Sequence, residues 1–202
     1  MRRNLYYLIL FIFITMISIG LSSIGPDERI LGSHAKLVYL HGAWVWTALL
    51  GFLSSAAFGL IGLLTQRASH HAWSIALSRA SLFFWVTYLP LSLWTMQANW
   101  NGLFLEEPRW RVSVHFAIIA LLIQVGITLM NKPPWGSFLN LTFFLSLGWA
   151  LIQSEQVMHP GSPITSSGSI RIQSIFALLL LLCLMAGWFL TNWFRVLNID
   201  PR

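Results

Sequence analysis

Histidine is the residue type in this chain best suited to chemistry, because six histidines stand against one cysteine and six carboxylates. The adjacent pair Glu106 and Glu107 does not have the facing geometry of an acid/base couple. His41 and His159 are the two histidines that stand out, since both fall beside aromatic residues on one predicted face of the protein. Two imidazoles that converge there can bind haem iron, hold copper or zinc, or relay protons.

The other four histidines have simpler interpretations. We expect His34 to be a loop residue, and the pair His70 and His71 to lie in a loop facing solvent or lipid headgroups. His115 is predicted to be a buried histidine bonded to a neighbouring helix.

The residues around the two leading histidines favour a large, flat, apolar ligand. Several of the eleven tryptophans lie near the same predicted face, where their rings offer broad apolar surfaces. Arg109, Arg111 and Arg171 can form forked hydrogen bonds with carboxylates such as the propionates of haem. The alternatives are an interfacial belt for the tryptophans and lipid phosphates for the arginines.

Motifs for bond-making chemistry are missing from the sequence. It contains no G-x-x-x-x-G-K-[ST], no H-E-x-x-H and no G-x-S-x-G. The single cysteine, Cys183, excludes an intramolecular disulfide, a cysteine-rich zinc site, an iron–sulfur cluster and covalent haem attachment. We therefore expect a binding protein and not an enzyme.

The elements that must position these residues are membrane helices. Of 202 residues, 56% are hydrophobic and 9% are charged, whereas a soluble domain carries roughly a quarter charged residues. Apolar runs without strand-like alternation predict an all-α polytopic membrane protein, because an open sheet cannot satisfy its backbone in lipid. We expect a single integral membrane domain over 1–202, with six transmembrane helices at 5–21, 37–64, 77–96, 112–130, 135–152 and 172–194.

The charges indicate an orientation. Six spans place both termini on one side, and we predict the cytoplasmic side of the inner membrane, with seven basic residues inside and five outside. The net charge of +6 is interpreted as this topology signal and not as a nucleic-acid surface. Long outer connections over 97–111 and 153–171 place the function at the outer face.

Three segments resemble the haem-handling membrane proteins of cytochrome c biogenesis, of the CcmC/CcsA type. YLHGAWVW (39–46) is similar to the family's His-x-Pro-x-x-Trp segment, with His41 and Trp46 in register and Ala43 in place of proline. WNGLFLEEPR (100–109) is similar to its tryptophan-rich loop, W-G-x-x-W-x-W-D-x-R. MHPGSPI (158–164) looks like the Leu-His-Gln-Gly segment before the last helix.

The resemblance implies a membrane component that holds non-covalent haem b at the outer face and delivers it during cytochrome c maturation. In this hypothesis His41 and His159 supply the axial nitrogens to the iron. The implied partners are haem, apocytochrome c, a haem chaperone and ABC-type transporter subunits. The porphyrin would be covered by Trp46, Trp100 and Phe104, with Arg109 or Arg111 on a propionate.

Two other functions stay open from the sequence. One is a haem-free structural subunit of a membrane complex. The other is a transporter of a small substrate or ion, for which intramembrane ionisable residues are the usual sign. The chain offers few of these beyond Arg79 and His115.

Overall fold

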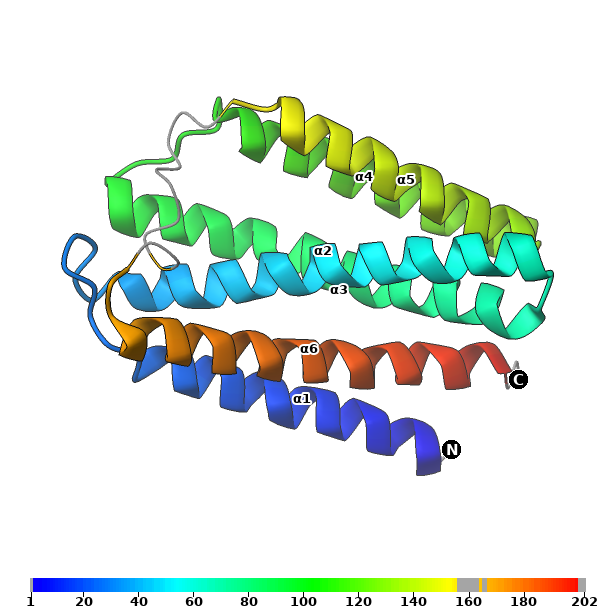
Figure 1. Cartoon of the computed structure of the whole chain (residues 1–202), viewed down its shortest axis with the longest axis horizontal. Helices are drawn as coiled ribbons and strands as arrows, with labels where there is room; N and C mark the ends of the chain where they lie inside the picture. Colours follow the sequence, from blue (N-terminus) through cyan, green and yellow to red (C-terminus); the bar gives the residue numbers. More distant parts are fainter. Residues whose placement is uncertain (1, 156–163, 165–166, 200–202) are drawn as a thin grey trace.

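A computed structural model describes residues 2–155, 164 and 167–199 and shows six helices in this part of the chain (Figure 1). Each is long and apolar enough to cross a membrane, which confirms a multi-pass, all-helical membrane protein. The helices are α1 (Arg2–Ser23), α2 (Ala35–Thr65), α3 (Ala68–Trp100), α4 (Pro108–Met130), α5 (Pro133–Gln153) and α6 (Ile170–Ile199).

Local sequence explains where several helices begin and end. Prolines open α4 and α5, where the missing N–H costs no helical hydrogen bond. Asn101 and Asn131 follow α3 and α4 with φ of 53° and 47°, the left-handed conformation that asparagine tolerates better than most residues. Residue types in the sequence therefore indicate where these helices begin and end.

Two predicted loops were too long. The helix predicted at 77–96 extends over Ala68–Trp100, so only residues 66–67 separate α2 from α3, and only residues 101–107 separate α3 from α4. His70 and His71 consequently lie in the first turns of α3, and His71 is buried, which contradicts the predicted exposed pair. The reason is that polar side chains on these turns pack against other helices, so low hydropathy did not mark a loop there.

The bundle is organised around α2 and α3, which pack along each other and separate two further pairs (Figure 1). Helices α4 and α5 lie together on one side, and α1 lies along α6 on the other. The start of α1 and the end of α6 reach the same end of the bundle, called here the terminal end. The opposite end, called the loop end, carries the connections 24–34 and 101–107.

A buried polar seam joins α2, α3, α4 and α5. Its bonds cross between helices: Asn140 Nδ2 donates to Ser74 Oγ (3.1 Å), and Gln124 Nε2 donates to Ser78 Oγ (2.8 Å). Polar side chains inside a membrane bundle find partners on neighbouring helices because lipid offers none. The seam consists of Ser55, His71, Ser74, Ser78, Gln124, Ser137 and Asn140, all of them buried.

Glycine allows the helices to approach closely beside the seam. A Cβ at Gly59 would lie 2.9 Å from the carbonyl oxygen of Ser137, and one at Gly62 would lie 2.8 Å from Nδ1 of His71. The first contact is with backbone, which cannot swing aside as a side chain can. Because these two positions lack Cβ atoms, α2 packs directly on the first turns of α3 and α5.

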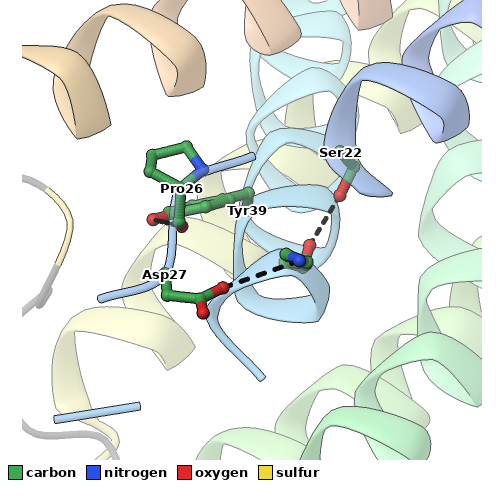
Figure 2. A network of polar contacts seen from close by, with 5 residues as sticks. Ser22, Pro26, Asp27 and Tyr39 are labelled. Carbon is green, nitrogen blue, oxygen red and sulfur yellow. Dashed lines mark hydrogen bonds and ion pairs between the residues drawn. The ribbon is translucent and has the colours of Figure 1, made fainter. Parts of the chain in front are cut away.

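The connection between α1 and α2 is held by polar contacts at the loop end (Figure 2). Ser22 Oγ donates to the carbonyl of Lys36 (2.6 Å), and Tyr39 donates its hydroxyl to the carbonyl of Pro26 (2.9 Å). The ammonium of Lys36 lies 3.5 Å from the carboxylate of Asp27. In the same connection, hydrogen bonds from the backbone N–H groups of Leu31 and Ile30 hold the pKa of Glu28 below its ordinary value.

We expect removal of the amide of Asn140, at the centre of the seam, to destabilise the protein. Asn140→Leu should lower the free energy of unfolding by about 1–2 kcal/mol, because Ser74 and Gln124 lose a partner in a place without water. Equilibrium unfolding in mixed micelles measures this. The matched control is Thr142→Val on the exposed face of the same helix, where the hydroxyl bonds only Phe138 of its own helix; it should change stability by less than about 0.5 kcal/mol. Equal losses in the two variants would contradict the role of the seam.

Candidate ligand site

A pocket of about 530 Å³ opens at the loop end between α2, α3, α4, the end of α5 and the start of α6. Its size lies within the range of small-molecule and cofactor sites, about 300–1,000 Å³. Most of its wall is apolar or aromatic, and the polar side chains in it come from three different helices. Such a wall suits a largely apolar ligand with a few polar groups.

His41 forms one side of this pocket and lies on α2 six residues after its start. Because α2 has 31 residues, more than the roughly 20 that span a bilayer, its first turns reach the membrane boundary. The imidazole packs edge-on against Tyr88, with ring centroids 5.7 Å apart. Tyr88 in turn contacts Trp85 (4.9 Å), whose Nε1 donates to the carbonyl of Ser113. His41 is thus packed against a wall that is itself held by α4.

Arg109 supplies the positive charge of the pocket. It lies in the first turn of α4, and its Nε is buried and makes no hydrogen bond within the described part of the chain. A buried guanidinium nitrogen without a partner is costly, which favours an acceptor on a ligand. Its neighbour Trp110 lines the pocket with it.

Arg111 has a different environment, although it lies only two residues further. Its guanidinium pairs with Glu106 at 2.9 Å, and both side chains are largely exposed. A rotation of about 200° separates residues two apart on a helix, so Arg109 and Arg111 face opposite ways. The structure therefore separates two arginines that were equivalent in the sequence.

The aromatic residues predicted to cover a ligand divide in the same way. Trp46 lines the pocket, while 52% of its surface remains exposed at the mouth. Trp100 and Phe104 contact each other edge-on at 6.1 Å in and beside the 101–107 connection, and neither lines this pocket. They remain at the loop end but not around the same cavity.

His159, the second predicted iron ligand, lies outside the described residues. Ile164, the last residue of the segment 158–164, is described; it is buried and lines the pocket. Ile164 therefore contributes to the same wall as His41.

One stripe of α3 was missed by sequence reasoning. Trp85, Tyr88, Ser92 and Met96 all line the pocket, and their spacing of three and four residues places them on one helix face. That spacing is readable in the sequence. Which face of α3 turns toward His41 depends on how α2, α3 and α4 pack, so the stripe became recognisable only in the fold.

The remaining histidines lie elsewhere. His34 is exposed before α2. His115 is exposed, and its Nδ1 lies 2.6 Å from the carbonyl of Arg111 in its own helix, so the predicted burial and bond to a neighbouring helix are wrong. Because α4 begins four residues earlier than predicted, His115 has a helical carbonyl one turn before it and needs no partner across the bundle.

The side chains of the pocket limit the kind of ligand that it can bind. Among residues 2–155, 164 and 167–199, no three His, Cys, Asp or Glu side chains lie close enough to hold a metal ion together. The described pocket offers one imidazole, one guanidinium, a phenol, a thioether and several aromatic faces. This set suits an organic ligand that brings its own metal or an anionic group.

Cysteines substituted at positions 109 and 111 should react with a maleimide at different rates. Cys183 is fully buried and should not react with a soluble reagent. A cysteine introduced at the surface is therefore the thiol whose reaction is measured. In detergent, Arg111→Cys should react with a soluble maleimide at the rate of an open surface thiol, and Arg109→Cys should react several-fold more slowly. Mass spectrometry of timed samples measures both rates. Equal rates would contradict the placement of residue 109 in the pocket wall.

Sequence similarity does not assign the chain to a family. No protein-family model matches it, and no curated protein matches it. The functional conclusion therefore depends on the pocket and on the three short segments that contribute to it.

Proposed function

We propose that the protein is a membrane haem-binding and haem-delivery component of cytochrome c maturation, with non-covalent haem b held in the pocket at the loop end. One observation carries the proposal. The three segments that resemble the haem-handling family are far apart in sequence, and each places a residue in this one cavity: His41, Arg109 and Ile164. A shared ligand explains why these segments converge.

The residues present fit haem. An imidazole such as that of His41 is a common ligand of haem iron. The aromatic rings of Trp46, Trp85 and Trp110 give the pocket apolar faces for a macrocycle. The guanidinium of Arg109 can form a charge-assisted pair with a propionate. Haem itself would supply the iron and its redox chemistry, while the chain binds it, orients it and limits access of water.

The second axial ligand in this proposal is His159, which lies five residues before Ile164 in the chain. Arg109, and not Arg111, is assigned to the propionate, because Arg111 pairs with Glu106 at the surface.

Trp100 and Phe104 are assigned to contact with apocytochrome c or a haem chaperone. The neighbouring apolar residues Leu103 and Leu105 are exposed, which fits a surface that meets a partner or the lipid interface.

The loop end is proposed to face outward from the inner membrane, with both termini in the cytoplasm. The acidic residues support this orientation, although they orient helices only weakly. Among the described residues all of them belong to the loop end: Asp27, Glu28, Glu106, Glu107 and Glu155.

Haem occupancy tests the proposal. We expect protein purified in detergent, with haemin added, to show a Soret band. His41→Ala should reduce occupancy by more than about tenfold, because even outer-shell partners of metal ligands contribute 10–100-fold to affinity. His159→Ala should change the spectrum as well. His34→Ala and His115→Ala are matched controls on exposed histidines and should leave the band unchanged.

Full occupancy with unchanged spectra in both His41→Ala and His159→Ala would contradict the ligand assignment. Protein that takes up no haemin and co-purifies with partners in fixed ratio would favour the haem-free structural subunit. Substrate uptake by vesicles without haem binding would favour the transporter.

The orientation has its own test. In intact cells, a membrane-impermeant maleimide should label Arg111→Cys, while Arg67→Cys in the turn between α2 and α3 should be labelled only after permeabilisation. Both positions are exposed, and Cys183 is buried. The opposite pattern would place the termini outside.

A further inference from the structure

A second pocket, of about 460 Å³, lies at the terminal end between α3, α4, the start of α5 and the end of α6. It is at the opposite end of the bundle from the proposed haem pocket and shares no lining residue with it. Two cations, Arg79 and Lys132, line it together with Asn131 and Thr128.

Arg79 lies eleven residues into α3, within a membrane-spanning helix. Its guanidinium donates to Thr128 Oγ1 (3.2 Å), and Thr128 is only two residues from the end of α4. A side chain on a helix leans toward the helix N-terminus, and the N-terminus of α3 is at the terminal end. Arg79 therefore extends along the bundle toward the level at which α4 leaves the membrane, as a snorkelling arginine does.

Lys132 lies at that same level, in the turn between α4 and α5. The side chains flanking the turn are apolar and exposed: Leu129, Met130 and Trp135. In a membrane protein this exposed apolar surface faces lipid. The pocket thus combines positive charge at the membrane boundary with a neighbouring surface for acyl chains.

The charge at this end has one sign in the described residues. Arg67, Arg79, Lys132 and Arg195 belong to the terminal half of the bundle, whereas the described carboxylates belong to the loop end. A basic pocket between transmembrane helices is suited to anionic lipid headgroups. A guanidinium matches two oxygens of a phosphate, and an ammonium adds a point charge.

We propose that this pocket binds the phosphate of an anionic phospholipid, with Arg79 and Lys132 as the recognising residues. The exposed apolar surface beside the pocket favours a lipid over free phosphate, because only a lipid has acyl chains that can lie along Leu129 and Met130. The inference is independent of the proposed haem site.

Native mass spectrometry of the full-length protein tests it, with phosphatidylglycerol, phosphatidylcholine or inorganic phosphate as the added probe. We expect phosphatidylglycerol adducts to be retained in preference to the other two. Each lost cation should weaken retention about fivefold, since one Lys or Arg near an anionic membrane contributes roughly that factor. Lys132→Gln therefore loses about fivefold and the pair Arg79→Gln with Lys132→Gln roughly thirtyfold.

Arg67→Gln is the matched control, because it removes an exposed charge at the same end that does not line the pocket. Lys132 is exposed, so its variant should fold even if the Arg79 variant does not. Equal retention of phosphatidylcholine and phosphatidylglycerol would overturn the proposal. So would loss of retention in Arg67→Gln equal to that in Lys132→Gln, or displacement of the lipid by inorganic phosphate.

Discussion

The absence of water inside a bilayer is the constraint on which the rest of this structure depends. Every polar group within the six helices must be satisfied by the protein, since lipid cannot replace a lost hydrogen bond. The chain meets much of this demand by turning polar residues toward one another in the seam between α2, α3, α4 and α5. Leucine, isoleucine and phenylalanine side chains cover much of the outer surface. The seam fixes the rotation of four helices and thereby decides which faces meet at each end.

Both pockets follow from that packing. With α3 rotated to place Ser74 and Ser78 in the seam, its stripe from Trp85 to Met96 faces α2 at the loop end. The same rotation sends Arg79 toward the end of α4. The two ends consequently differ in chemistry: one has an imidazole among aromatic rings, and the other has a guanidinium and an ammonium beside lipid-facing leucine. One arrangement of helices thus forms both cavities, one lined mainly by apolar and aromatic side chains and the other containing two cations.

Hydropathy located the apolar part of each helix well, but it did not show how far the polar ends of the helices extend. Apolar runs such as 112–130 and 135–152 differ from the observed helices by a few residues, because desolvation alone makes such a run helical in lipid. The start of α3 was missed because Ser69, His70 and His71 resemble a loop by composition. In the fold His71 bonds Ser137 on α5, a contact 66 residues away that no local pattern reveals.

The sequence by itself determined the membrane class and the number of helices, and it offered His41, His159, Trp46, Trp100, Phe104, Arg109 and Arg111 as one undivided set of candidate ligand residues. The membrane class and the helix count depend on residue type and on the length of apolar runs, which are local properties. Only the tertiary structure decided that Arg109 and not Arg111 enters the pocket, that Trp100 and Phe104 stay outside it, and that Tyr88 and Met96 complete it. Those outcomes depend on the rotation of one helix against another, which is set by contacts between residues far apart in the chain.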